Sequence, residues 1–231
     1  MLLDKSWPTV ARAHALRAVD DIAMQHDDVD AEPDLIRALH NGPPGLRAEA
    51  AALLGRRDKV DGNVVKHVYR RMQRDTDASV RAACATALGN FGDVDAAAPL
   101  FSSLDETDET ARAAKIEAIR NIGYWAIAPG FVNSADTRVR SATIESLSGV
   151  CDEQAVSALT FAVSSGADAD TRADAVKGVV ASVKACRAIQ KKETVDAMMA
   201  TLNAATRDEA PAVRAAARAA LSALADAGGG R

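Results

Sequence analysis

One arginine recurs along the chain at the spacing of a helical hairpin. Its copies are separated by 35, 34, 31, 28, 32 and 42 residues, and an aliphatic residue stands seven positions after each copy. The copies are Arg12, Arg47, Arg81, Arg112, Arg140, Arg172 and Arg214. A period of this length is typical of helical hairpins that stack into a solenoid, because one such hairpin cannot bury its apolar face alone.

The clearest copy runs from Asp77 to Leu104. Its first half carries small and apolar residues at helical spacing as far as Gly89–Gly92, where glycine can accept the left-handed backbone that ends a helix. Asp93 then stands where it can cap a second helix, which places Leu100 and Leu104 on one face. The segment therefore predicts two antiparallel helices joined by a tight turn.

Composition favours helices throughout. Hydrophobic residues make up 48% of the chain but aromatic residues only 3%. A core rich in alanine and poor in aromatics suits closely approaching helices better than a β-sandwich. No run alternates apolar and polar residues between glycine-rich turns, as strands would. We therefore predict an all-α fold.

The segments SVRAACATALGNFGDVDAAAPL and TRVRSATIESLSGVCDEQAVSAL resemble HEAT repeats, in the short form known from phycobilin lyases. The resemblance extends from about Pro8 to Leu224. It implies a right-handed α-solenoid of about six to seven HEAT-like hairpins whose second helices line the concave face. It also implies a ladder of Asp and Arg between repeats. The expected ladder residues are Asp77, Arg81, Asp136, Arg140, Arg47, Arg112, Arg172 and Arg214.

This reading predicts one repeat domain over residues 1–228, followed by a flexible tail at residues 229–231. The repeats are expected to begin near residues 9, 44, 77, 110, 136, 169 and 210. Within the ladder, Asp77 and Asp136 each stand four residues before an arginine. Asp170 stands only two before Arg172, so the ladder is expected to be incomplete.

Charge and cysteine usage bound the surroundings. The formal net charge of -4 argues against general nucleic-acid binding, and no apolar run is long enough to span a bilayer. Cys84, Cys151 and Cys186 lie far apart and form no CxxC pair. We therefore expect each to be a small buried apolar residue rather than a disulfide partner or metal ligand. These features predict the cytoplasm or another reducing, soluble compartment.

A basic stripe follows the second helix of the second hairpin. Lys66, Arg70 and Arg74 are four residues apart and so share one helix face, with Arg71 adjoining. A charged run of this kind is commonly the solvated side of a helix. The alternative is that it binds an acidic segment of a partner protein. Both interpretations stay open.

Tyr124 and Trp125 form the only adjacent pair of aromatics in the chain. They occupy the predicted turn of the short fourth hairpin. Packing into the wedge that a short repeat leaves is the favoured interpretation. A hot spot for partner binding is the alternative.

Motifs for catalysis are missing from the sequence. It contains no HExxH, GxSxG or GxGxxG, and no glycine loop that would cradle phosphate. The histidines, His14, His26, His40 and His67, do not form the His-Glu pairs of the HEAT-repeat hydroxylases that bind di-iron. We therefore predict no catalytic, cofactor-binding or metal-binding residues.

These observations predict a non-catalytic scaffold or assembly factor that binds a segment of another protein along its concave face, as a subunit of a larger complex. Two other classes stay open. One is a chromophore-handling subunit like those of phycobilin lyases, on the resemblance alone. The other is a HEAT-like protein that binds nucleic acid, which the acidic balance of the chain disfavours.

Overall fold

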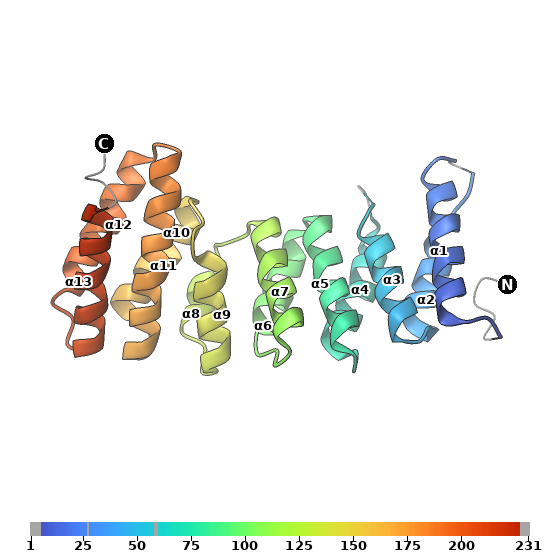
Figure 1. The fold of residues 1–231 in the computed structure, drawn as a ribbon, viewed down its shortest axis with the longest axis horizontal. Coiled ribbons are helices and arrows are strands. Elements are labelled where there is room, and N and C mark those ends of the chain that lie inside the picture. Colours follow the sequence, from blue (N-terminus) through green and yellow to red (C-terminus); the bar gives the residue numbers. More distant parts are fainter. Residues whose placement is uncertain (1–5, 27, 58–59, 227–231) are drawn as a thin grey trace. The chain divides into compact units, whose positions relative to one another are not determined.

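The computed structural model describes residues 6–26, 28–57 and 60–226. These residues form thirteen α-helices and one 3-10 helix and contain no strand (Figure 1). The predicted all-α fold of stacked helical hairpins is therefore confirmed. The chain divides into two compact units, Met1–Gly123 (unit 1) and Tyr124–Arg231 (unit 2). The single domain over residues 1–228 stays a prediction, and the predicted tail at 229–231 lies outside the described residues.

Unit 1 is a stack of first helices with second helices on one side of it. The first helices are α1 (Thr9–Ala23), α3 (Pro44–Leu54), α5 (Ala78–Phe91) and α7 (Glu109–Ile122). The second helices are α2 (Glu32–Asn41), α4 (Gly62–Arg74) and α6 (Ala97–Ser102), the last of which follows the 3-10 helix η1 (Val94–Ala96). First helices pack on first helices, and α2 also contacts α4. In Figure 1, α4 and α6 lie behind α5 and α7.

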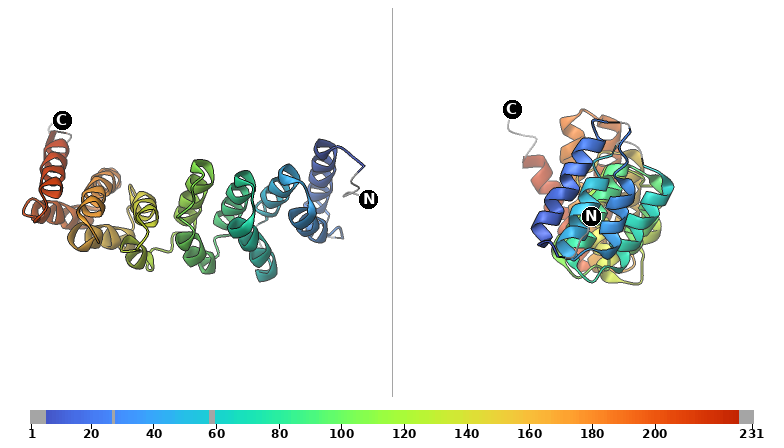
Figure 2. Two further views of the ribbon diagram at one scale, coloured as in Figure 1. Left: turned by 90° about the horizontal axis from the view of Figure 1, so that it is seen from below. Right: turned by 90° about the vertical axis from the view of Figure 1, so that its right-hand side faces the viewer.

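Unit 2 has the same construction. Its helices are α8 (Ala128–Val132), α9 (Thr137–Leu147), α10 (Glu153–Ser165), α11 (Ala169–Ala188), α12 (Lys192–Ala205) and α13 (Pro211–Asp226). The first helix α11 packs between α9 and α13, while the second helix α10 contacts α8 and α12. Figure 2 shows these hairpins from two further directions.

Six of the α-helices that the structure describes begin after an aspartate N-cap. A carboxylate at the N-cap accepts hydrogen bonds from backbone N–H groups in the first turn, which have no partner inside the helix. The capping residues are Asp61, Asp77, Asp108, Asp136, Asp152 and Asp168. Gly92 (φ 64°) and Gly123 (φ 67°) end α5 and α7 in the left-handed conformation that glycine adopts without strain. Local chemistry therefore marks the ends of these helices.

The core follows the arginine repeat. The aliphatic residues seven positions after the arginines are buried at Leu54, Leu88, Ile119, Leu147 and Val179. Small residues let neighbouring first helices approach closely: a Cβ added to Gly89 would lie 2.7 Å from the Cα of Ala118. Gly55 meets Ala87 in the same way, at 2.9 Å.

The expectation for two of the cysteines was wrong. Cys151 and Cys186 form a disulfide, with their Cα atoms 5.2 Å apart. Their sequence separation of 35 residues is about one repeat, so equivalent parts of adjacent hairpins bring the two side chains together. Cysteines a whole repeat apart form no local motif such as CxxC, so the sequence did not indicate this disulfide. Cys84 is a free, buried cysteine, and its burial raises the pKa of its thiol to about 12.

The predicted reducing compartment loses the support that it drew from cysteine usage, because disulfides persist mainly in oxidising surroundings. The compartment stays a prediction. Within residues 6–26, 28–57 and 60–226, the helices are all too short or too polar to cross a membrane.

Candidate functional site

The ladder arginines donate hydrogen bonds to the backbone of the turn that precedes their own helix. Nη1 donates to the carbonyl oxygen six residues earlier, at 2.9 Å from Arg81, 2.7 Å from Arg140, 3.4 Å from Arg172 and 2.8 Å from Arg214. In Arg47 the acceptor lies five residues earlier, at 2.9 Å. These bonds hold the guanidinium plane in a similar orientation in successive repeats.

The other edge of the same guanidinium binds the next hairpin. Nε and Nη2 donate to the two oxygens of one carboxylate, the geometry in which arginine and carboxylate match best. These two-point pairs are Arg47 with Asp75, Arg81 with Glu106, and Arg172 with Asp208. In Arg140, Nη2 binds Asp168 at 2.6 Å while Nε donates to Thr171. Arg112 lies half-buried at the same position of α7.

Sequence reasoning missed the carboxylates that complete these pairs. Asp77, an expected ladder residue, caps its own helix by accepting from the backbone N–H of Ser79. Asp136 caps α9 in the same manner and also pairs with Arg138. For Arg47 and Arg81 the partner carboxylate stands two residues before the cap, as in Asp75-Thr-Asp77, whereas Asp168, the partner of Arg140, is itself the cap of α11. An acid six residues before an arginine is the signal that would have found the partners of Arg47 and Arg81.

The ladder carboxylates are held in the charged form. Hydrogen bonds from Arg81 lower the pKa of Glu106 to about 2, with further help from Lys115. Hydrogen bonds from Arg172 likewise lower the pKa of Asp208. These groups are engaged in structural pairs and therefore serve the packing of the repeats.

The basic stripe on α4 is a surface feature of unit 1. Lys66, Arg70 and Arg74 are exposed, while Val64 and other residues on the opposite face are buried. None of the three cations forms an ion pair with any residue that the structure describes. They are therefore available to charges from outside the chain.

Arg71, the fourth residue of the predicted stripe, has a different environment. Its Nη2 donates to the backbone oxygen of His40 on α2 at 2.5 Å, and its Nη1 lies 3.3 Å from Asp75. It is half-buried and ties α4 to α2. We therefore define the α4 basic stripe as Lys66, Arg70 and Arg74.

A pair of histidines lies beside this stripe. His40 Nε2 and His67 Nδ1 are 2.7 Å apart, and they join α2 to α4. Burial lowers the pKa of His40, and the nearby His67, Arg71 and Arg70 lower it further. One nitrogen of the pair must donate and the other accept, so the contact requires at least one neutral ring.

The two aromatic residues belong to unit 2. Trp125 is only 3% exposed, whereas Tyr124 is 40% exposed. Trp125 borders a shallow hollow of about 510 Å³ that Pro129 and Glu153 also line. The indole is thus mainly a packing element, whereas the phenol ring is partly open to solvent.

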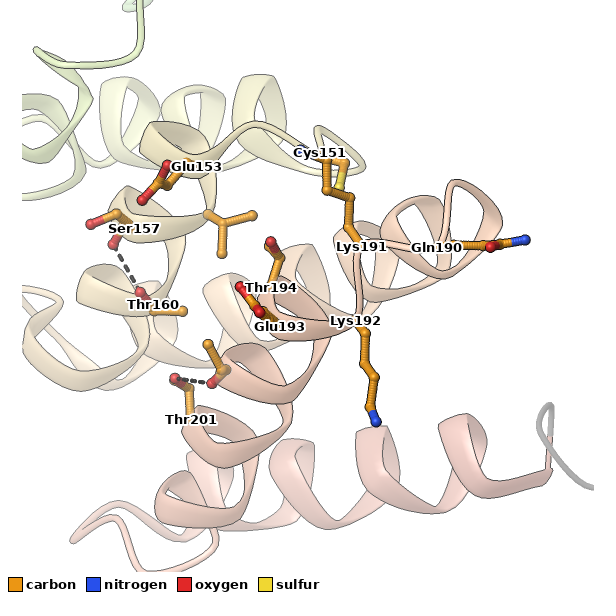
Figure 3. Close-up of a pocket in the computed structure, with 12 residues that line it drawn as sticks. Cys151, Glu153, Ser157, Thr160, Gln190, Lys191, Lys192, Glu193, Thr194 and Thr201 are labelled. Carbon is orange, nitrogen blue, oxygen red and sulfur yellow. Dashed lines mark hydrogen bonds between the residues drawn. The ribbon is translucent and has the colours of Figure 1, made fainter.

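A larger hollow in unit 2 was not predicted from the sequence. It lies between α10 and α12, has a volume of about 750 Å³, and is lined by Ser157, Thr160, Thr194 and Thr201 (Figure 3). Cys151, Lys191, Lys192 and Glu193 also line it, and in Figure 3 Glu193 lies beside Thr194 while Lys191 lies near Cys151. Hydroxyl groups spread over two helices carry no motif, which is why the sequence gave no sign of the hollow. Among the described residues, no three His, Cys, Asp or Glu side chains gather as a metal ion would require.

A comparison with protein families decides the repeat type. Residues 65–129, from α4 to α8, match the family model described as HEAT repeats. Over these residues the chain is similar to HEAT repeats. The HEAT match includes α5 and its ladder arginine, Arg81. No curated protein sequence matches the chain.

Solved structures similar to this chain include human deoxyhypusine hydroxylase in complex with glycerol. It is 18% identical, with a TM-score of 0.45, and the match covers 96% of this chain and 92% of that chain. The archaeal HEAT-like repeats protein from Thermococcus onnurineus NA1 is 14% identical, with a TM-score of 0.47 and 92% of each chain covered. The complex of CpcE and CpcF of phycocyanin lyase from Nostoc sp. PCC7120 is 20% identical, with a TM-score of 0.45. This match covers 95% of this chain and 90% of that chain. At these identities and scores, no function is carried over.

Proposed function

We propose that this protein is a non-catalytic scaffold or assembly factor, and that its α4 basic stripe binds an acidic segment of a partner protein. The observation that carries the proposal is the contrast among its arginines. Ladder arginines such as Arg47 and Arg81 pair with carboxylates of the chain, whereas Lys66, Arg70 and Arg74 do not pair with any described residue. Unpaired cations on one helix face are suited to a partner that brings the opposite charge.

The placement of the stripe supports a segment as the ligand. Second helices of successive hairpins lie side by side, since α2 contacts α4. A partner segment lying along α4 would meet a cation at each turn, because residues four apart repeat along one face. Such contacts give association that weakens as salt rises.

The test is a binding titration of the full chain with a short fluorescent peptide rich in Asp and Glu. The wild-type chain is expected to bind this probe with an affinity that falls with ionic strength. The variant Lys66→Glu/Arg70→Glu/Arg74→Glu is expected to bind it about ten-fold more weakly or worse. Circular dichroism checks that the variant keeps its helices.

A matched control uses three cations of unit 2. The variant Lys184→Glu/Lys191→Glu/Lys192→Glu makes the same change in net charge on exposed residues of another surface. It is expected to bind the probe within about two-fold of wild type. Equal losses in both triple variants would show nonspecific attraction and would overturn the proposal. Tighter binding of a DNA oligonucleotide than of the peptide at the α4 basic stripe would also overturn it.

A further inference from the structure

Arg214 on α13 is a ladder arginine that binds the turn before its helix but pairs with no carboxylate of a following hairpin among the described residues. Its Nη1 donates to the carbonyl oxygens of Asp208 at 2.8 Å and Glu209 at 2.7 Å. In Arg81 and Arg172, the remaining edge, Nε and Nη2, binds a carboxylate of the following hairpin. In the part of the chain that the structure describes, the same edge of Arg214 makes no hydrogen bond.

This open edge is already oriented. The two carbonyl bonds of Arg214 are the same pair that Arg140 makes, six and five residues before the arginine. They fix the guanidinium plane before any ligand arrives, which lowers the entropic cost of binding. A planar fork held in this way selects a carboxylate, since Nε and Nη2 match its two oxygens.

The outer side of α13 differs from the earlier first helices at one position: four residues after the ladder arginine, where α3 and α5 have the buried Ala51 and Ala85, α13 has the exposed Arg218. On α13, Val213, Ala217, Ala220 and Leu224 are buried, and α13 packs on α11 and α12. Small residues stand on the opposite side and are exposed, at the helical spacing of three and four. They are Ala212, Ala215, Ala219 and Ser222.

Ser222 also holds a specific position in the repeat. It stands eight residues after its arginine, as Gly55 and Gly89 do. A Cβ added to Gly55 or Gly89 would lie 2.9 or 2.7 Å from the backbone of the next first helix. The outer side of α13 therefore combines the guanidinium fork of Arg214, which is free to bind a carboxylate, with room for another helix.

We propose that the outer face of α13 docks a helical hairpin of a different protein, with an Asp or Glu in the turn before its leading helix bound to Arg214. The precedent within the chain is direct: Asp208 lies in the turn before α13 and pairs with Arg172 on the helix beneath. A second copy of this chain is a poorer occupant. Its α1 has Ser6 six residues and Pro8 four residues before Arg12, so those positions supply no carboxylate.

The test places a photo-crosslinking amino acid at Ser222 of the full chain, expressed in the cells that encode it. One adduct is expected, and mass spectrometry should place the cross-link in a helical hairpin with an acidic residue just before a helix. Arg214→Gln should reduce the adduct about ten-fold. Lys177→Gln, which removes an exposed cation from α11, should leave it within about two-fold.

A charge exchange separates recognition from misfolding. Arg214→Glu should abolish the adduct, and Arg in place of the partner's acidic residue should restore it. A misfolded variant would not regain binding in this way. The proposal is overturned by failure of the exchange, by the absence of an adduct, by an adduct insensitive to Arg214→Gln, or by an adduct with a second copy of this chain.

Discussion

Arg81 and Glu106 form a two-point ion pair between neighbouring hairpins, with Nε 2.7 Å from Oε2 and Nη2 2.8 Å from Oε1. The Nζ of Lys115 lies 3.1 Å from the same Oε2. The three side chains are 16%, 6% and 4% exposed, in that order. Charges this far from water are stable only while each has its partner. The contact between α5 and α7 therefore depends on Glu106 as well as on apolar packing.

Replacement of Glu106 by Gln should destabilise unit 1 strongly. The change leaves Arg81 and Lys115 buried with uncompensated charge, which costs about 3–5 kcal/mol. Chemical denaturation of the full chain measures the loss. Asp105→Asn in the same loop changes an exposed carboxylate and should alter the free energy of unfolding by about 0.5 kcal/mol at most. Equal effects of the two substitutions would contradict the role given to the pair.

Stability should fall in acid, and Glu106 should account for part of the fall. Its pKa is about 2 in the folded chain against an ordinary value of 4.5, because Arg81 donates hydrogen bonds to it. A depressed pKa means that the unfolded state takes up the proton first. The contribution of Glu106 is therefore complete above about pH 4.5 and is lost as the pH falls toward 2.

The size of this effect follows from the shift. Between pH 5.5 and 2.5, the free energy of unfolding should lose about 2–3 kcal/mol through Glu106 alone. Denaturant titrations between pH 5.5 and 2.5 should show that the free energy of unfolding of Glu106→Gln depends correspondingly less on pH than that of wild type. Parallel curves for the variant and wild type would mean that Glu106 titrates normally.

Gly89→Ala should weaken the stacking of α5 on α7. The added Cβ would lie 2.7 Å from the Cα of Ala118, a backbone atom that can move only with its helix. Overpacking of this kind costs about 1–3 kcal/mol. Gly62→Ala on α4 is the matched control, since its Cβ would meet open space, and thermal unfolding compares the two. A neutral Gly89→Ala would show that the helices separate freely.

The double variant Cys151→Ser/Cys186→Ala should be less stable than wild type. The disulfide closes a loop of 35 residues in the unfolded chain, for which the chain-entropy estimate is about 4 kcal/mol. Intact mass before and after reduction tests for the bond itself. Denaturation should give the reduced chain and the variant the same free energy of unfolding, below that of the oxidised chain. Identical curves for all three would contradict the prediction.

Cys84 should resist alkylation in the native protein. Burial raises the pKa of its thiol to about 12, so the reactive thiolate is almost absent at pH 8. Iodoacetamide followed by mass spectrometry should find Cys84 unmodified until denaturant is added. Fast labelling under native conditions would show that α5 opens locally.

The hairpin architecture could be predicted from the sequence because it is written in local signals. The arginine spacing, the capping aspartate Asp77 and the glycine stop at Gly92 act within a few residues of where they stand. The first helices begin at Thr9, Pro44, Ala78, Glu109, Thr137, Ala169 and Pro211. Periodicity also identified Lys66, Arg70 and Arg74 as one helix face.

Contacts between repeats were harder to predict, because they depend on how one hairpin is placed on the next. Asp75 and Asp77 differ by two residues, yet one pairs with Arg47 while the other caps α5. The partner of Cys151 lies a whole repeat away. Arg71 adjoins the α4 basic stripe in the sequence but binds the backbone of His40, which sequence spacing does not reveal.

The covalent link between Cys151 and Cys186 changes how unit 2 would respond to tension. A force applied at the two ends of the chain passes through the sulfur bridge, so the residues between the cysteines carry no load. That segment would stay slack even after its helices melt. Reduction would release it and lengthen the stretched chain by roughly 120 Å at full extension.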